Sequence, residues 1–369
     1  MLRLERREHP PASLLVAAPF LALLATVLAG AALFSLFGAD PARGLALFFV
    51  EPLKDARALS ELSVKATPLL LVALGLSACF RSNVWNIGAE GQFIAGAVFA
   101  TGVAIHGGLH PPRSIFIAVL AAGALGGAAW AAIPAFLRHR YHANEILVSL
   151  MLVYVAELSL DYLVYGPWKD PEGYNFPQTI LFPSATRVPR LVDGFRANVG
   201  LPVALFAVLL VWLFLFRTAR GFELEVFGRS PRAARYAGYS EPVALYTAFL
   251  GSGALAGLAG ALEAAGPLGQ LTPHVPVGYG FAGIIVAFVG RLHPFGVVVS
   301  SFLMSMFYIG GELAQSRLGL PKSLTLVFQG VLLFALLACD SLVRYRVRGA
   351  AAPSPLGEKA IAAPEPPAG

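Results

Sequence analysis

The sequence predicts an all-α polytopic membrane protein of about ten transmembrane helices, with some short or broken segments and both termini cytoplasmic. Hydrophobic residues make up 57% of the 369 residues and charged residues only 13%, whereas soluble domains carry about 25% charged residues. The mean hydropathy is +0.70, and several apolar runs reach the roughly 17–25 residues that a helix needs to cross a bilayer. The net charge is +6. We attribute it to an excess of Lys and Arg in the cytoplasmic segments of a membrane protein rather than to a nucleic-acid site.

The chain is expected to begin with a cytoplasmic N-terminus, residues 1–13, followed by a first span at Leu14–Phe37. The basic start and small residues of this region also resemble a signal peptide. However, its apolar run is longer than the roughly 7–15 residues of a signal-peptide core. We therefore interpret it as a retained helix. The polar stretch that follows, with Lys54 and Arg57, is expected to be partly helical at the membrane surface.

The transmembrane domain is predicted to occupy residues 14–343, with a disordered cytoplasmic tail at 344–369, because the Ala- and Pro-rich end cannot form a core. Gly166–Val199 is the longest interior loop, and loops of that length are usually functional or flexible. Tyr279–Gly290 is too short to cross as a straight helix and is expected to be a half-helix or a re-entrant segment. The remaining spans are expected at Leu62–Phe80, Gly88–Ile105, Ser114–Leu137, Asn144–Tyr165, Gly200–Phe216, Pro242–Ala264, Phe295–Gly311 and Ser323–Leu342.

The distribution of charge supports this count and orientation. Short loops with an excess of Lys and Arg face the cytoplasm in most membrane proteins. With the N-terminus inside, the outer segments mix bases with acids such as Asp55, Asp170 and Glu172. The inner segments carry Arg81, Arg138, Arg140, Arg217, Arg220, Arg229, Arg232, Arg235, Arg291, Arg344, Arg346 and Arg348.

Polar residues interrupt the apolar pattern between the second and third spans, and we select five of them as substrate-path candidates. Polar groups at membrane depth are costly unless they pair within protein or line a water-filled path. One interpretation is a turn that lines the pore or lies beside the substrate. The other, equally open, is a cytoplasmic turn whose Asn and Glu cap helix ends. The candidates are Asn83, Trp85, Asn86, Glu90 and Gln92.

A second polar segment lies between the sixth and seventh spans. Ser230 followed by Pro231 indicates a helix start, and Gly238 is a favoured helix terminator, so a short basic helix is predicted over Pro231–Ala237. This helix suits a docking site for a soluble partner, although a plain connecting loop is the alternative. The candidate docking residues are Gly228, Arg229, Pro231, Arg232, Ala234, Arg235, Tyr236 and Gly238.

Some acids lie near the ends of spans, where a structural role is the simpler explanation. Glu157 and Asp161 share one helix face and are expected to reach the interface or to pair with Lys169. Glu263 and Glu312 lie at the ends of their spans, and either could face a substrate path. Asn144 and Glu145 are expected to cap the start of their helix.

Glycine spacing in two spans predicts tight helix packing. Gly123 and Gly127 are separated by three residues, as are Gly253 and Gly257. Small residues at this spacing let two membrane helices approach closely.

Motifs for catalysis and cofactor binding are absent from the sequence. There is no GxxxxGK[ST] phosphate loop, no HExxH and no GxSxG. The two cysteines, Cys79 and Cys339, form neither a CxxC nor a metal-like cluster. We therefore predict a non-catalytic chain with no cofactor or metal of its own.

Four segments resemble the permeases of bacterial ABC importers for simple sugars and purine nucleosides, within the wider ribose and branched-chain amino acid group. They occur in the family's order. The segments are Ser82–Gln92 (SNVWNIGAEGQ), Ala143–Leu152 (ANEILVSLML), Gly228–Gly238 (GRSPRAARYAG) and Gly278–Gly296 (GYGFAGIIVAFVGRLHPFG).

The resemblance implies an importer permease in the bacterial inner membrane. Its expected partners are a second permease in a heterodimer, a cytoplasmic ABC ATPase that binds ATP, and an external substrate-binding protein. It also implies that the ATPase docks on the helix that ends at Gly238. A branched-chain amino acid-type permease remains an alternative within this group. An ion-coupled secondary transporter, which would need paired ionisable residues near mid-membrane, is an alternative from another class.

Overall fold

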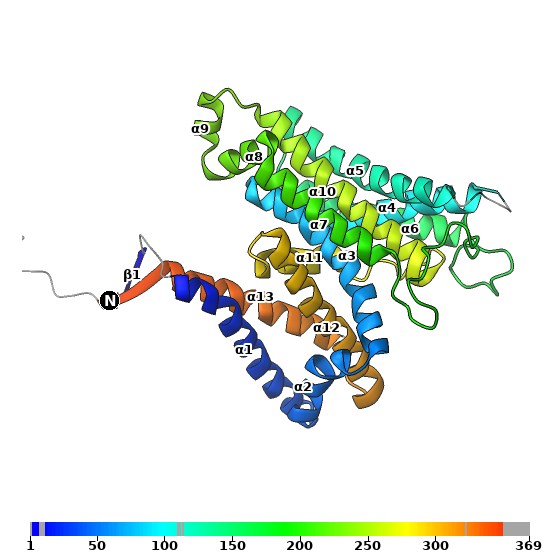
Figure 1. The fold of residues 1–369 in the computed structure, drawn as a ribbon, viewed down its shortest axis with the longest axis horizontal. Helices are drawn as coiled ribbons and strands as arrows, with labels where there is room; N and C mark the ends of the chain where they lie inside the picture. Colours follow the sequence, from blue (N-terminus) through cyan, green and yellow to red (C-terminus); the bar gives the residue numbers. More distant parts are fainter. Residues whose placement is uncertain (1, 7–11, 109–111, 113, 322, 350–369) are drawn as a thin grey trace, which may run out of the picture. The chain divides into compact units, whose positions relative to one another are not determined.

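The computed structural model describes residues 2–6, 12–108, 112, 114–321 and 323–349 (Figure 1). Of the predicted disordered tail, 344–369, residues 350–369 fall outside the described residues, whereas Arg344 ends the last helix and Tyr345–Gly349 form a strand. The chain divides into two compact units, Met1–Ala29 with Val331–Gly369 and Gly30–Gly330. Helices dominate both units.

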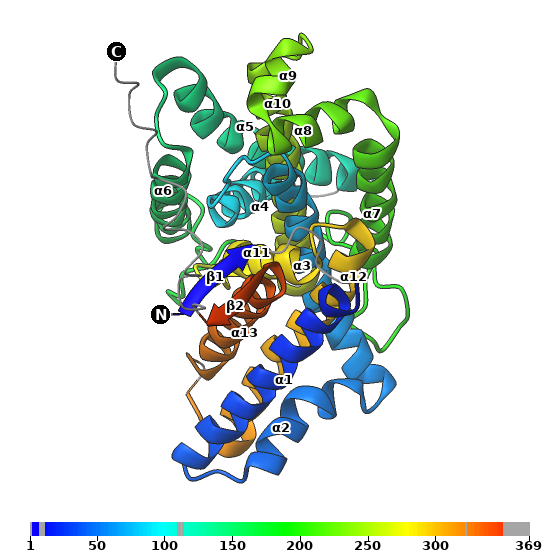
Figure 2. The same ribbon diagram turned by 90° about the vertical axis from the view of Figure 1, so that its left-hand side faces the viewer.

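The first unit contains two strands that the sequence analysis did not predict. Strand β1 (Leu2–Arg6) pairs antiparallel with β2 (Tyr345–Gly349), so that Leu2 lies opposite Gly349 and Arg6 opposite Tyr345 (Figure 2). β1 precedes the first helix and β2 follows the last. The all-α fold class holds for the body of the chain, and the short ladder is an addition to it, formed because both ends contain alternating side chains that suit strand pairing.

Each expected span corresponds to a helix. Among the described residues, six helices are long and apolar enough to cross a membrane, namely α3, α5, α6, α7, α10 with its extension, and α12. The short helix α2 precedes α3, and the short helices α8 and α9 lie between α7 and α10. The bounds are α1 Ala12–Leu36, α2 Pro41–Phe49, α3 Ala56–Arg81, α4 Ala89–His106, α5 Ile115–Tyr141, α6 Glu145–Tyr165, α7 Gly200–Arg217, α8 Ala219–Arg229, α9 Pro231–Tyr236, α10 Glu241–Glu263, α11 Tyr279–Val289, α12 Pro294–Leu318 and α13 Ser323–Arg344. A 3-10 turn, Glu51–Leu53, precedes α3, and a π-helix, Ala264–Leu268, extends α10.

Helix α3 forms the centre of the second unit. It packs against α10, α12, α11 and α7, and 89% of its apolar window is buried inside the protein, against 22% for α6. An almost fully buried helix is hydrophobic on all sides, as a core helix must be. The outer faces of α5, α6 and α7 are left for lipid or another chain.

Helices α4, α5 and α10 cross at the glycines whose spacing predicted close packing. A Cβ on Gly257 would overlap the carbonyl oxygen of Gly123 and lie 2.8 Å from the Cα of Gly127. A Cβ on Gly253 would overlap the side chain of Ala131 in the same way. The predicted tight crossing is confirmed, because only residues without a side chain allow these backbones to touch.

The long loop between α6 and α7 is tied to the end of α10. The amide of Val188 donates to the carbonyl of Ala265 at 2.9 Å, and that of Phe182 donates to Gly269 at 2.8 Å. The hydroxyl of Ser60, in α3, accepts the amides of Arg196 and Ala197. These bonds fix a segment that otherwise has little regular structure.

Candidate functional site

The first predicted segment forms the turn between α3 and α4. The hydroxyl of Ser82 donates to the carbonyl of Cys79 at 2.8 Å and closes the end of α3. Asn83 then takes a left-handed conformation with φ of 56°, which asparagine tolerates better than most residues. Gly88 is the N-cap residue of α4, and a Cβ there would lie 2.6 Å from the carbonyl oxygen of Ser149. The sequence of the turn therefore reflects both its backbone shape and its close contact with α6.

Asn86 and Gln92 form a reciprocal pair inside the protein. The amide nitrogen of Asn86 donates to Gln92 Oε1 at 2.9 Å, and Gln92 Nε2 donates to Asn86 Oδ1 at 3.0 Å. Asn86 also donates to the hydroxyl of Ser252, in α10, and accepts the amide of Gly88. Both side chains are buried. The pair closes the turn onto the first helical residues of α4 and joins it to α10.

Glu90 joins the turn to the half-helix α11. Its Oε1 accepts the amide of Gly278 at 2.8 Å, and its Oε2 accepts the amide of Gly280. These are two of the amides that a helix N-terminus leaves without an intrahelical partner. A carboxylate is favoured at that end by the helix dipole as well. Glu90 therefore caps a helix far away in the sequence, although its side chain is buried.

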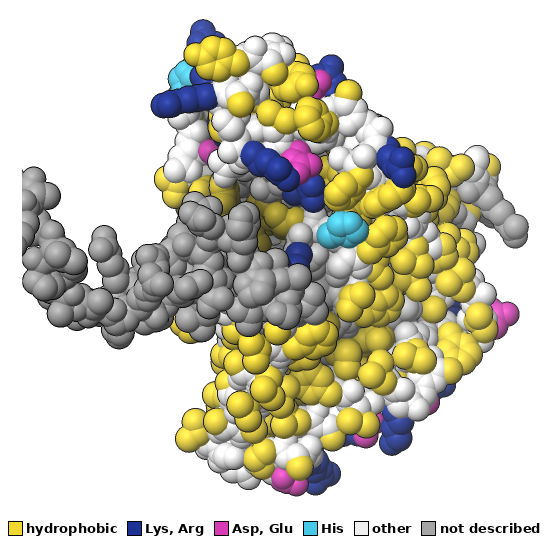
Figure 3. All heavy atoms as spheres, turned by 60° about the vertical axis from the view of Figure 1, so that its left-hand side comes forward, with side chains coloured by type: hydrophobic (Ala, Val, Ile, Leu, Met, Phe, Trp, Pro, Cys, Tyr) yellow, Lys and Arg dark blue, Asp and Glu magenta, His cyan; other side chains and the backbone are white. Residues whose placement is uncertain are grey.

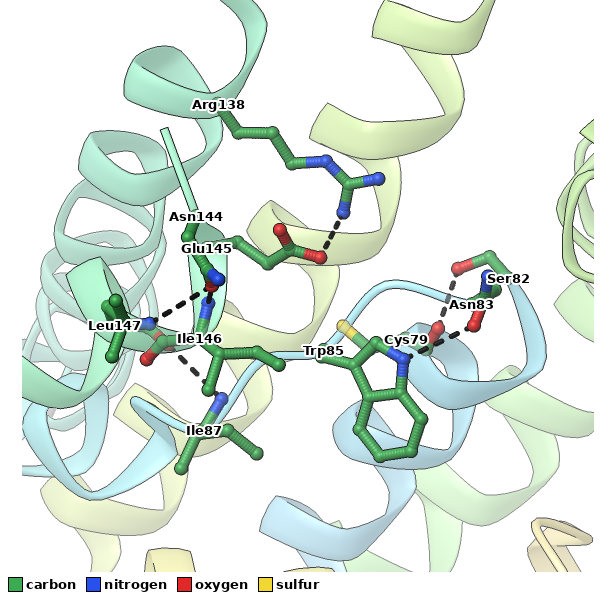
Figure 4. A network of polar contacts seen from close by, with 11 residues as sticks. Cys79, Ser82, Asn83, Trp85, Ile87, Arg138, Asn144, Glu145, Ile146 and Leu147 are labelled. Atoms are coloured by element: carbon green, nitrogen blue, oxygen red, sulfur yellow. Dashed lines mark hydrogen bonds and ion pairs between the residues drawn. The ribbon is translucent and has the colours of Figure 1, made fainter. Parts of the chain in front are cut away.

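Trp85 and Asn83 differ from the other three candidates because they face outward. The indole of Trp85 is 38% exposed, and its N–H donates to Asn83 Oδ1 at 3.2 Å (Figure 4). The ring centroid of Trp85 lies 5.3 Å from that of Phe80 and 6.4 Å from that of Phe288. Trp85 and Asn83 therefore lie near the C-terminal end of α11, whereas Glu90 caps its N-terminal end. A role of any of the five in the substrate path remains a prediction.

The turn between α5 and α6 lies beside the first segment, as Figure 4 shows. Asn144 Oδ1 accepts the amides of Ile146 and Leu147 at 2.9 and 3.3 Å, so the predicted cap is confirmed. Glu145 pairs with Arg138 at 2.5 Å instead of acting as a second cap. The hydroxyl of Ser149 accepts the amide of Ile87 at 3.3 Å. The segments Ser82–Gln92 and Ala143–Leu152 are therefore in direct contact.

The predicted docking helix is present as α9. The hydroxyl of Ser230 accepts the amide of Ala233 at 3.3 Å, Pro231 is the first helical residue, and Gly238 has φ of 81°. The helix ends at Tyr236, one residue earlier than predicted. Tyr236 is 94% exposed. In Figure 3, Lys and Arg side chains gather at the top of the face, where α8 and α9 lie in Figure 1.

The inner side of this docking segment is packed against the turn after α3. Gly228 lies so close to the carbonyl of Arg81 that a Cβ would overlap it. Ala234 is fully buried in an apolar cluster with Val84 and Phe227. Glu225 in α8 accepts both Arg81 at 3.2 Å and Arg229 at 2.6 Å. The α8–α9 segment is therefore in direct contact with the turn that leads from α3 to α4.

Other predicted acids have contacts that the sequence did not specify. Glu312 pairs with Lys65, in α3, at 3.0 Å. Glu263 is buried near Lys65 and Arg196, within electrostatic range of both. Lys169, the expected partner of Glu157 and Asp161, instead donates to Asn175.

Sequence reasoning missed two polar residues deep in the helix bundle. The hydroxyl of Tyr279 and the side-chain nitrogen of Gln329 are both buried without a hydrogen-bond partner among the described residues. The sequence did contain a signal for Gln329, because it is a lone glutamine in the apolar run of α13. Tyrosine gives no such signal, because its ring suits an apolar helix whether or not its hydroxyl is paired.

Comparison with known proteins places these features in a family. The chain matches the model of the family described as "Branched-chain amino acid transport system / permease component" over residues 58–337. A glucose ABC transporter permease protein of Haloferax volcanii is 34% identical over 94% of this chain and 93% of its own. A guanosine ABC transporter permease protein of Bacillus subtilis is 30% identical over 86% of this chain and 91% of its own.

A more distant relative and one solved structure also match. A nucleoside ABC transporter permease protein of Lactococcus lactis is 26% identical over 86% of this chain and 90% of its own. An inward-facing putative metal-chelate type ABC transporter has a TM-score of 0.41 and 15% sequence identity, covering 89% of this chain and 99% of that one. With the family match covering most of the described helices, the chain belongs to the branched-chain amino acid transport system permease family, the membrane permease components of ABC transporters.

Proposed function

We propose that the chain is the permease subunit of an ATP-driven importer that carries nucleosides or simple sugars across the inner membrane. The observation that carries this proposal is the near full-length similarity to a glucose permease and a guanosine permease, at 34% and 30% identity. The chain has none of the phosphate-loop sequence that ATP hydrolysis requires. The energy would therefore come from a separate ATPase.

The proposed topology has ten spans with both ends in the cytoplasm. Pairing of β1 with β2 supports it, because these strands precede the first helix and follow the last one. The two strands carry Arg3, Arg6, Arg346 and Arg348, and basic residues at span ends favour the cytoplasm. The turns at 82–88 and 142–144 and the α8–α9 segment would share that side.

The ATPase would dock on α9. The outer side of α9 presents an exposed aromatic ring, Tyr236, and the guanidinium group of Arg235, at 63% side-chain exposure, and Arg229 at the end of α8 is 80% exposed. The inner side is held by Ala234 of α9 and by Gly228 of α8. Aromatic and arginine side chains are enriched at protein interfaces. Closure of the ATPases on ATP would push α9 against the turn after α3.

A second, related permease and an external substrate-binding protein would complete the transporter. The sparsely buried helices α5, α6 and α7 leave apolar faces free for lipid or for the second permease. The ordered loop 166–199, on the side opposite to α9 in the proposed topology, offers a surface for the binding protein. It also borders a cavity of about 820 Å³ lined by Arg187, Arg190 and the π-helix backbone.

The proposal is tested by reconstituting the chain in liposomes with its genomic neighbours for a second permease, an ATPase and a binding protein. We expect labelled guanosine or glucose to accumulate when ATP is supplied to the ATPase side. An ATPase variant without its phosphate-loop lysine is the matched control and should abolish accumulation. ATP-dependent accumulation of leucine alone would indicate the branched-chain amino acid alternative. Uptake that needs an ion gradient and not ATP would indicate a secondary transporter.

A further inference from the structure

The segment between the π-helix and α11 is irregular backbone that leads from the exposed His274 to the buried start of α11. α11 begins at Tyr279, which is fully buried, and residues 269–278 before it form no regular helix. Within a membrane, such backbone is tolerated only where it is buried in protein or lines a cavity. Interrupted helices of this kind form solute sites near the bilayer midplane in many transporters.

Polar groups without partners converge at this point. The hydroxyl of Tyr279 has no hydrogen-bond partner among the described residues, and neither has the side-chain nitrogen of Gln329. Tyr308 links the two, since its ring centroid lies 5.3 Å from that of Tyr279 and its hydroxyl lies beside Gln329. Leaving a buried polar group unpaired is unfavourable. A ligand that offers hydrogen-bond partners to Tyr279 and Gln329 would remove this cost at both positions.

The surroundings of these groups resemble a site for a ring-shaped polar molecule. The rings of Phe93 and Tyr308 flank Tyr279 with centroids 5.8 and 5.3 Å away. Small-molecule sites are generally lined by apolar and aromatic side chains with a few placed polar groups. Solutes with hydroxyl groups on a ring match this combination.

The charge at the start of α11 disfavours an anionic solute. A free helix N-terminus would attract a carboxylate or phosphate, but Glu90 already accepts the amides of Gly278 and Gly280 there. Glu263 and Glu312 lie within electrostatic range of Tyr279, and Lys65 is paired with Glu312 at 3.0 Å. An anion would therefore meet acids, and two of the backbone donors at this end of α11 are already taken by Glu90.

We propose that Tyr279, at the start of α11, and Gln329, in α13, form a binding site for an uncharged, hydroxyl-bearing ring solute on its way through the permease. This inference rests on the proposed function and narrows it. It favours nucleosides and sugars over amino acids, because the chain's own carboxylate takes the place that a solute carboxylate would need.

The experiment uses the complete transporter in liposomes at saturating concentrations of loaded binding protein, so that the permease step is measured. Tyr279→Phe removes one hydroxyl and keeps the ring. We expect it to lower transport of guanosine or glucose, whichever the wild type carries, about 10-fold, as the loss of one buried hydrogen bond would. In a series of deoxy analogues, the analogue that lacks the hydroxyl bound by Tyr279 should be carried equally well by the variant and the wild type.

Gln329→Leu provides the second variant, with an analogue profile expected to differ from that of Tyr279→Phe. The matched control is Tyr162→Phe, on the exposed face of α6, which should leave every rate unchanged. The inference would be overturned if both variants carried every analogue at the wild-type rate. It would also be overturned if both variants lost the same fraction of transport for every analogue. A wild type that carries neither guanosine nor glucose, nor any of their analogues, would instead refute the proposed function.

Discussion

The segments 82–92 and 228–238 are both polar interruptions of an apolar chain, yet the structure uses them in opposite ways. In the first, Asn86, Glu90 and Gln92 are turned inward and each has a hydrogen-bond partner. In the second, α9 turns Tyr236 and its arginines outward and buries only small apolar groups such as Ala234. Polarity alone therefore marks a break in the helix pattern without indicating which way the side chains face.

The difference follows from what each side chain needs when it leaves water. An amide can be fully satisfied by another amide, and one carboxylate can be satisfied by two backbone N–H groups. A guanidinium group has five donors, and burying its charge costs far more unless acceptors surround it. Amides and a single acid can therefore tie elements together inside the bundle, whereas the arginines of α9 stay at the surface, where a partner can reach them.

The largest effect on stability is expected for Glu90→Ala. The change leaves the amides of Gly278 and Gly280 buried without an acceptor, at about 1–3 kcal/mol for each group. Glu90→Gln keeps one acceptor oxygen and should lose less. Thermal unfolding of the purified permease in detergent measures both losses.

Glu172→Ala, in the exposed part of the long loop, is the matched control for removal of an acid. Its unfolding temperature should equal that of the wild type. If Glu90→Ala unfolds at the same temperature as Glu172→Ala, the carboxylate of Glu90 does not stabilise α11. The inward-facing polar residues of segment 82–92 would then not hold the bundle together.

Sequence reasoning located the helices well because long apolar runs are a strong signal. It placed α9 to within one residue, since the Ser–Pro start and the glycine end depend only on local geometry. It could not assign Glu90 to α11, because that contact joins residues far apart in the chain. It also missed the β1–β2 pairing, because the two alternating stretches are only 5 residues long each and lie at opposite ends of the chain.

A smaller effect is expected for the Asn86–Gln92 pair, and a double-mutant cycle measures it. Because the two amides bond reciprocally, the single changes Asn86→Ala and Gln92→Ala should each remove most of the same interaction. The coupling energy should be about 1–2 kcal/mol, within the range for residues in direct contact. Asn86→Ala combined with Asn144→Ala, in the turn before α6, is the additive control. A coupling no larger than that of the control pair would show that the reciprocal bonds contribute nothing specific.

The smallest effect on stability is expected for changes on the outer side of α9, where the effect on transport should be large. Combined Arg232→Ala, Arg235→Ala and Tyr236→Ala should change the free energy of unfolding by no more than about 0.5 kcal/mol per substitution, as surface changes generally do. The ATPase should no longer co-purify with the permease, and ATP-dependent uptake should fall more than 10-fold, an order-of-magnitude expectation for the loss of interface anchors.

Arg140→Ala, an exposed arginine on the same proposed side but outside α9, should retain both the ATPase and uptake. Stable, properly folded protein with normal uptake in the triple variant would remove the docking role from α9. Loss of folding in that variant would show that its side chains are structural, as those of segment 82–92 are. A docking role is supported only if the triple variant keeps its stability and loses both ATPase binding and uptake. That result would mean that the exposed charges of α9 serve to bind a partner.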